Sequence, residues 1–298
     1  MKNRFLFNNR KKVDFIIIIP TVAKEKNQKR VEKILELIIK YPPKKFSYNI
    51  YLAYKGKDWN EAVNNSFKKL KNKVKEGFLL LDDDSFPLPG WMDDFERFVY
   101  KYKNSILQFN LVDTNGIIAW GRKLLKLNKL AMAFLSFWFS PLFIAKFKPY
   151  ARSISVRKKT KVTRIHTAGF SAVFVPIKIL NEIGGVKDRK EDNNIVYHED
   201  SDFCYRAFMK GYFSYEIPRK VLHIGFVTKS KKVYEKMDKE EYSRIWLVKK
   251  WYTNREFIKK LREANLIDSK FTFLKIIWEG IKKKVMKFFS KKINPMSI

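Results

Sequence analysis

The chain has 298 residues, 46% of them hydrophobic and 16% aromatic, which excludes a disordered protein and allows one large α/β domain. Its 63 lysines and arginines against 30 aspartates and glutamates give a formal net charge of +33. A field of this sign attracts polyanions such as anionic lipid, nucleic acid or phosphorylated substrates, although the codon bias of an AT-rich genome accounts for part of the composition. The single cysteine, Cys204, excludes an intrachain disulfide and fits a reducing compartment.

Apolar runs alternate with amphipathic segments along the chain. The predicted strands are residues 15–19, 48–54, 78–81, 105–112, 171–175 and 221–224, and the predicted helices are residues 29–40, 59–74, 92–100 and about 200–210. Strand, helix, strand, helix, strand is the order of βαβ units. The pattern therefore predicts an α/β fold with a mostly parallel central sheet flanked by helices.

Three consecutive aspartates follow the predicted strand 78–81. The run Asp82-Asp83-Asp84 is followed by a turn with Pro87 and Pro89-Gly90. Carboxylates released at the C-terminal end of a strand lie where open α/β sheets bind ligands. Oxygen ligands suit Mg²⁺ or Mn²⁺, which often bridge to substrate phosphates. The pattern indicates metal-assisted binding of a phosphorylated donor, and a solvated acidic turn is the alternative.

Three stretches together resemble the inverting, nucleotide-sugar-dependent glycosyltransferases of family 2, which have the GT-A fold. The first is Asp14-Phe-Ile-Ile-Ile-Ile-Pro-Thr21, and the second is the acidic triplet followed by Pro-Leu-Pro-Gly-Trp at residues 87–91. The third runs from Gly184-Gly185 through Glu199-Asp200-Ser201-Asp202, Arg206 and Gly211-Tyr212 to His223. The resemblance covers about residues 13–225. It implies a single GT-A domain that transfers a sugar from a nucleotide-sugar to a hydroxyl group with the help of Mn²⁺ or Mg²⁺.

The resemblance also implies a role for individual residues. Asp84 coordinates the metal on the donor diphosphate, Asp82 assists through the ribose or a water, and His223 reaches the metal or the diphosphate. Asp200 is the general base and Glu199 positions the acceptor, whereas Asp202 is expected to cap the helix that begins there. Charge at a helix N-terminus, stabilised by the helix dipole, is the alternative for this acidic group. The remaining expected contacts are Pro20, Thr21, Tyr54, Asn60, Asn64, Asp82 and Asp83 for the donor nucleotide, and Trp91, His166, Gly169 and Glu199 for the acceptor.

The sequence departs from the family pattern at two places. No acidic residue directly follows the second predicted strand, because Asp58 comes late, so the nucleotide is left open, with a UDP- or GDP-sugar favoured and Tyr54 expected to stack on the base. A Gln-x-x-Arg-Trp motif of the processive synthases is missing. Transfer of a single sugar to a glycan or a lipid-linked acceptor is therefore expected.

Two apolar segments with basic flanks or neighbours predict contact with a membrane surface. Residues 130–145 carry no charge and are flanked by lysines and arginines, but 16 residues are too few for a transmembrane helix, which needs about 20. Residues 270–298 contain a helical apolar stripe among lysines. We expect a glycosyltransferase domain at 1–230 with an insertion at about 120–160, and a C-terminal helical extension at 231–298. Packing of both segments on protein is the alternative.

These features predict a cytoplasmic enzyme that is peripheral on the cytoplasmic face of an anionic membrane; no N-terminal signal peptide is visible. Two other functions remain open. One is a non-catalytic protein on a GT-A scaffold that binds membranes or polyanions. The other is a glycosyltransferase that acts on modified DNA, which is less favoured because no segment resembles a nucleic-acid-binding module.

Overall fold

The computed structural model describes residues 4–5, 12–21, 25–54, 59–112, 124–125, 162–165, 167–186, 199–223, 246–247, 250–251, 254–264 and 267–268. The strands are β1 (Arg4–Phe5), β2 (Val13–Thr21), β3 (Tyr48–Tyr54), β4 (Val74–Leu81), β5 (Ser85–Pro87), β6 (Ile106–Val112), β7 (Leu124–Leu125), β8 (Thr163–Ile165), β9 (Ala172–Pro176), β10 (Ser214–His223) and β11 (Ile267–Asp268). The helices are α1 (Glu25–Lys40), α2 (Trp59–Leu70), the 3-10 helix η1 (Lys71–Lys73), α3 (Trp91–Phe98), α6 (Ile177–Ile183), α7 (Glu199–Met209) and α9 (Arg255–Glu263).

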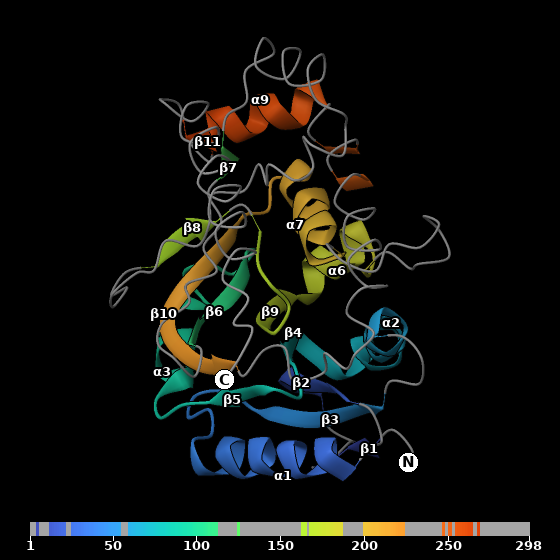
Figure 1. Cartoon of the computed structure of the whole chain (residues 1–298), viewed down its shortest axis with the longest axis vertical. Helices are drawn as coiled ribbons and strands as arrows, with labels where there is room; N and C mark the ends of the chain where they lie inside the picture. Colours follow the sequence, from blue (N-terminus) through green and yellow to red (C-terminus); the bar gives the residue numbers. More distant parts are fainter. Residues whose placement is uncertain are drawn as a thin grey trace, which may run out of the picture.

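One large sheet organises the described part of the chain (Figure 1). Its strand order is β1-β3-β2-β4-β9-β6-β10-β5, with β8 paired to β10. The strands β3, β2 and β4 are parallel to one another, and β6 is parallel to β10. Between these groups β9 runs antiparallel to both β4 and β6. The five longest strands therefore run in one direction, which confirms the predicted α/β fold with a mostly parallel central sheet.

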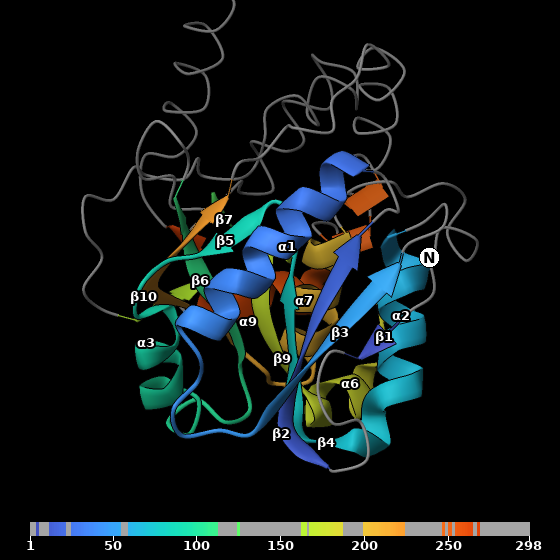
Figure 2. The ribbon, with the colours of Figure 1, turned by 90° about the horizontal axis from the view of Figure 1, so that it is seen from below.

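Helices cover both faces of the sheet, and α1 crosses in front of the strands in Figure 2. Phe95 of α3 packs against Phe15, Phe109 and Phe174, with ring centroids 5.1–5.8 Å apart. Phe67 of α2 contacts Phe78 of β4 at 5.1 Å. Because Phe78 pairs with Ile16, the neighbour of Phe15, and side chains alternate along a strand, α2 and α3 lie on opposite faces.

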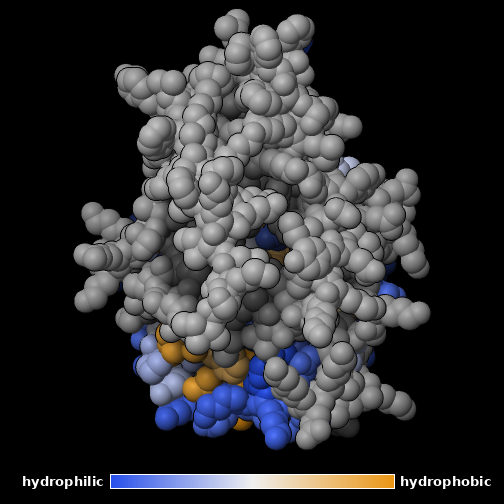
Figure 3. Space-filling model, in the orientation of Figure 1, coloured by the Kyte–Doolittle hydropathy of each residue, from blue (hydrophilic) through white to orange (hydrophobic). Residues whose placement is uncertain are grey.

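The outer side of α1 is hydrophilic, as its helical pattern predicts. Figure 3 shows blue residues along the lower edge of the molecule, where α1 lies, next to a smaller orange area. Ile39 and Tyr100 are the large hydrophobic residues that stay exposed in the described part of the chain. Single exposed apolar residues of this kind are normal on a soluble surface.

Residues from the expected C-terminal extension pack against α7. Tyr205 and Phe208 of α7 form a second buried cluster with Trp251, Phe257 and Leu261. The ring centroids of Tyr205 and Phe257 lie 4.7 Å apart. Residues from 246–247, 250–251 and 254–264 of this extension therefore share a core with the helix that carries the second acidic motif. Of the insertion expected at about 120–160, the structure describes residues 124–125; the rest of it and the basic segment 270–298 lie outside the described residues.

Candidate functional site

The acidic triplet lies at the C-terminal edge of the parallel strands. The strand β4 ends at Leu81, and the amide of Asp82 donates to the carbonyl of Ser171 at 2.9 Å. This bond extends the antiparallel β4–β9 ladder, in which Leu81 pairs with Ala172. The direction of β9 therefore brings the segment 167–171 alongside the triplet.

The strand β10 brings a histidine to the same place. β10 pairs antiparallel with the short strand β5, so that His223 lies opposite Ser85. The Nε2 atom of His223 is 3.3 Å from Oδ1 of Asp84, and both side chains are mostly buried. Burial lowers the pKa of His223, but the hydrogen bond and charge of Asp84 and the charge of Asp82 outweigh it, so the net pKa is raised above its usual value.

The other two aspartates of the triplet point to different partners. Oδ1 of Asp82 accepts a hydrogen bond from the indole nitrogen of Trp59 at 3.0 Å. Asp83 is buried, and its Oδ2 accepts from the hydroxyl of Thr21 at 2.8 Å. Asp83 thus points into the protein and links the triplet to the end of β2 through Thr21. Asp82 and Asp84 lie together at the edge of the sheet. The sequence pattern predicts Trp59 as the first residue of a helix and indicates no contact with Asp82.

The second acidic motif forms the first turn of α7. Oδ1 of Asp200 accepts from the amide of Ser201 at 2.6 Å and from its hydroxyl at 3.2 Å. The other oxygen, Oδ2, faces Gly169, where it would lie 3.9 Å from a Cβ atom built on that residue. Glu199 precedes Asp200 and is half-buried. The helix is held on the segment 167–170 by the buried Cys204, whose Sγ atom accepts from the amide of Ala168 at 3.3 Å.

A buried glutamine from β6 lies beneath this segment. The Oε1 atom of Gln108 accepts from the amide of Gly169 at 2.7 Å, and the side chain is fully buried. The register of the parallel strands places Gln108 beside Glu216, a buried carboxylate that accepts a hydrogen bond from Asn110. The buried layer beneath the segment 167–170 is therefore polar. No sequence motif indicates Gln108, Asn110 or Glu216 as part of the site.

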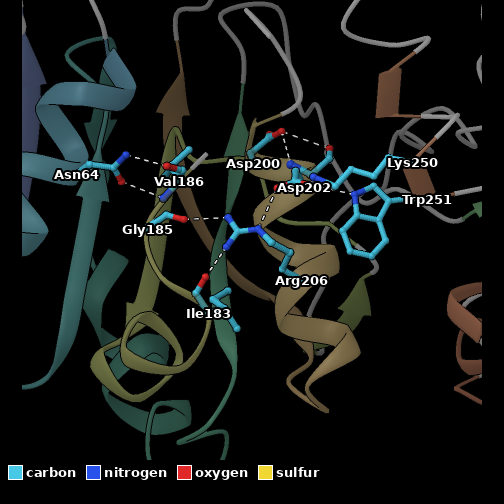
Figure 4. Close-up of polar contacts among 10 residues, drawn as sticks. Asn64, Ile183, Gly185, Val186, Asp200, Asp202, Arg206, Lys250 and Trp251 are labelled. Atoms are coloured by element: carbon cyan, nitrogen blue, oxygen red, sulfur yellow. Dashed lines mark hydrogen bonds and ion pairs between the residues drawn. The ribbon is translucent and has the colours of Figure 1, made fainter. Parts of the chain in front are cut away.

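Asp202 has a different role from the helix cap that the sequence predicted. It lies inside the first turn of α7, is fully buried, and accepts hydrogen bonds from Arg206, Lys250 and Trp251 (Figure 4). Its partners Lys250 and Trp251 come from a part of the chain far downstream, which local capping rules cannot anticipate. The expectation of an N-cap is thus corrected to a buried, fully paired carboxylate.

The remaining candidates lie in varied surroundings. Asn60 is buried in α2. The side-chain amide of Asn64 donates through its nitrogen to the carbonyl of Val186 at 2.7 Å and accepts through its oxygen from the amide of Val186 at 2.9 Å. Trp91 is fully buried, donates its indole hydrogen to the carbonyl of Tyr41 at 3.0 Å, and so belongs to the core. Pro20 and Tyr54 lie at the ends of β2 and β3, at the same edge as the triplet. His166 lies outside the described residues.

Asp84 and His223 could bind a metal ion together with oxygens of a substrate, but not as a complete set of protein ligands. Among the residues that the structure describes, no group of three or more histidine, cysteine or acidic side chains could hold a metal ion alone. Asp84 and His223 offer one oxygen and one nitrogen within 3.3 Å of each other. Mg²⁺ and ions of similar chemistry are commonly bound by one or two protein ligands together with substrate phosphates.

The groove between α2 and α6 is separate from the carboxylates. It has a volume of about 610 Å³ and is lined by Asn64, Lys68, Lys71 and Arg206 among others, but by none of the aspartates named above. In the described part of the chain, no helix is long and apolar enough to cross a membrane.

No family model and no curated protein matches the sequence. Among solved structures, GalNAc-T7 with UDP, GalNAc and Mn²⁺ is similar at a TM-score of 0.52 and 12% identity, over 81% of this chain and 49% of that one. TarS of S. aureus (residues 1–349) has a TM-score of 0.41 and 13% identity, over 71% of this chain and 60% of that one. The chain spans about half the length of the GalNAc-T7 structure. The likeness to GalNAc-T7 shows the fold, a GT-A type α/β domain.

Proposed function

We propose that this chain is a glycosyltransferase that moves one sugar from a nucleotide-sugar donor to a hydroxyl group of an acceptor, with inversion at the anomeric carbon. A fold alone does not determine a function, so the proposal rests on the site. The observation that carries it is the meeting of two acidic motifs at one sheet edge. Asp82 is bonded to Ser171, and Asp200 lies over Gly169, two residues earlier in the same segment.

The first motif is the proposed donor site. Asp84 and His223 are the residues that would hold Mn²⁺ or Mg²⁺ together with the donor diphosphate. When bound, the cation stabilises the negative charge of the departing nucleoside diphosphate. Asp82, whose Oδ1 accepts a hydrogen bond from Trp59, would bind the ribose directly or through a water. The crystallisation of GalNAc-T7 with UDP and Mn²⁺ supports a UDP-sugar as the first donor to test.

The second motif is the proposed acceptor side. Oδ2 of Asp200 takes the proton from the acceptor hydroxyl as that oxygen attacks the anomeric carbon. The bonds from Ser201 to Oδ1 hold the carboxylate in one orientation. Glu199 and the open face of Gly169 then contact the acceptor. We leave Trp91 out of this set because its side chain is fully buried.

The net charge of +33 favours an acceptor at an anionic surface. We keep a glycan or a lipid-linked saccharide as the acceptor class and a peripheral position on the cytoplasmic face of a membrane as part of the proposal. The charge alone equally suits a polyanion-binding protein without catalysis, or a glycosyltransferase that acts on modified DNA. Flotation with anionic or neutral liposomes, with duplex DNA as competitor, separates these alternatives.

The test is a thermal-shift screen with UDP-, GDP-, CMP- and dTDP-sugars, with and without Mn²⁺. A ligand that binds the folded state raises the melting temperature by mass action. We expect one nucleotide class to stabilise the protein only with Mn²⁺, and Asp84→Asn to abolish this effect. Asp93→Asn removes an exposed carboxylate on α3 that pairs with Lys44 at 3.8 Å, and serves as the matched control. No shift with any donor, in folded protein, would overturn the proposal.

A further inference from the structure

The buried carboxylate of Asp202 is the centre of a bonded cluster beside the acidic pair (Figure 4). Oδ2 accepts from Nε of Arg206 at 2.9 Å. Oδ1 accepts from the indole nitrogen of Trp251 at 2.9 Å and from the ammonium group of Lys250 at 3.0 Å. Both oxygens of this side chain, which is only 1% exposed, are therefore occupied by protein donors.

Helical geometry separates Asp202 from Asp200. Successive residues of an α-helix are rotated by about 100°, so two residues that are two positions apart point to nearly opposite sides. Asp200 faces Gly169, whereas Asp202 faces the downstream segment that contains Lys250 and Trp251. Asp202 is thus directed away from the proposed reaction centre and does not touch substrate.

Arg206 links the cluster around Asp202 to the segment 183–186. Its Nη1 and Nη2 atoms donate to the carbonyls of Ile183 and Gly185, at 2.6 and 2.8 Å. Asn64 of α2 holds the next residue, Val186. The first turn of α7 is therefore fixed from two sides, by α2 through the segment 183–186 and by the downstream segment through Lys250 and Trp251.

The downstream side is itself anchored by packing. The ring of Trp251 lies 5.7 Å from that of Tyr205 and 5.1 Å from that of Phe257 in α9. Removal of one partner from a buried carboxylate leaves an uncompensated charge, which is strongly destabilising. The position of the first turn of α7 therefore depends on residues far from it in the sequence.

We propose that Asp202 is a positioning residue for the pair Glu199–Asp200, and that Lys250 and Trp251 set the place of this pair through Asp202. This inference rests on the proposed function, since the pair is the proposed acceptor side of a glycosyltransferase. It makes the segment around residues 250–251 a part of the catalytic unit and not an appendage.

The first variants are Lys250→Met, which removes the cation, and Lys250→Arg, which keeps it. Lys250 is 31% exposed, so its replacement is compatible with folding, and Asp202 retains Arg206 and Trp251. The matched control is Lys259→Met on α9, a lysine that is 76% exposed and pairs with the surface residue Glu263 at 3.9 Å. Trp251→Phe removes the indole donor to Oδ1 of Asp202 and keeps an aromatic ring.

Two readouts separate positioning from general stability. Hydrogen–deuterium exchange of a peptide that covers 199–209 should be faster in Lys250→Met than in wild type, with Lys250→Arg and Lys259→Met unchanged. Hydrolysis of UDP-GalNAc, UDP-glucose and GDP-mannose with Mn²⁺ should show kcat lowered by about tenfold or more, with KM within about twofold, since a displacement of about 1 Å can cost 10²-fold. Lys250→Arg should restore kcat.

The inference is overturned if exchange of the first turn of α7 is the same in Lys250→Met and in wild type. It is also overturned if kcat and KM of the two proteins agree. If wild type neither binds nor hydrolyses any donor, the proposed function fails, and the exchange experiment still decides whether Lys250 holds α7 through Asp202.

Discussion

The side chains of His223 and Asp84 meet with Nε2 and Oδ1 3.3 Å apart, although one ends β10 and the other lies in the turn between β4 and β5. If both ligate a metal, His223→Ala should weaken Mn²⁺ binding in the presence of UDP by at least about tenfold, since even outer partners of metal ligands contribute 10–100-fold. Isothermal titration with Mn²⁺ at saturating UDP measures this. Equal affinities in the variant and wild type would remove His223 from the site.

The indole of Trp59 is predicted to orient Asp82. Trp59→Phe deletes the hydrogen bond of 3.0 Å to Oδ1 and keeps an aromatic ring near Phe170, whose centroid is 6.1 Å away. A hydrogen bond to a charged group contributes about 1.5–3 kcal/mol, less where water can replace it. We expect the dissociation constant for UDP with Mn²⁺ to rise by about fivefold, with little change in melting temperature. A large loss of stability with unchanged binding would make Trp59 purely structural.

Much of the fold could be predicted because its strands are short apolar runs between helical patterns. The strand 48–54 was expected at the bounds that the structure has, and 78–81 is the buried end of β4. The antiparallel direction of β9 could not be read, because an apolar run does not encode its orientation. The proline at 87 predicts a turn, whereas the structure has the short strand Ser85–Pro87 there. This strand lies at the edge of the sheet, where proline is tolerated.

The candidate site was predictable only in part. The proximity of Asp84 and His223 came from the resemblance to a family, since no periodicity links residues so far apart. Trp91 belonged to the same motif, but its side chain fills the core. The local pattern predicts a helix cap at Asp202, whereas its partners Lys250 and Trp251 are distant in the sequence. Tertiary partners of this kind are absent from any local pattern.

Gly77 in β4 should be essential for stability. A Cβ atom at this position would lie 2.9 Å from the Cα atom of Pro176 and closer still to the carbonyl oxygen of Val175, both in the backbone of β9. Because the backbone of a neighbouring strand cannot move cheaply, Gly77→Ala should lower the free energy of unfolding by about 1–3 kcal/mol. Urea unfolding followed by circular dichroism measures it, and an unchanged midpoint would contradict the register of β4 and β9.

Asp14 should make stability depend on pH. Partial burial opposes its ionisation, but hydrogen bonds from the hydroxyl and amide of Ser47 and the nearby Lys75 more than offset this, so its pKa is lowered. A lowered pKa gives stability that is present above the unfolded value of about 3.9 and is lost as the pH falls through the folded value. Asp14→Asn should be less stable than wild type at pH 7, and the difference should shrink below about pH 4. Urea midpoints across this range test the sign; a constant difference would contradict it.

Gly169 offers the sharpest separation of folding from function. A Cβ atom there would meet Oδ2 of Asp200 at 3.9 Å and Oε1 of Gln108 at 4.0 Å, which are ordinary contact distances. Gly169→Ala should therefore keep the urea midpoint of wild type, in contrast to Gly77→Ala. The new methyl group occupies the space in front of Oδ2 of Asp200, where the acceptor hydroxyl is proposed to lie. We expect the rate of donor hydrolysis or transfer to fall by about tenfold or more, since small displacements at a reacting centre are costly, while UDP and Mn²⁺ bind as before. Full activity in Gly169→Ala would place the acceptor elsewhere and leave Asp200 without its proposed role as the base.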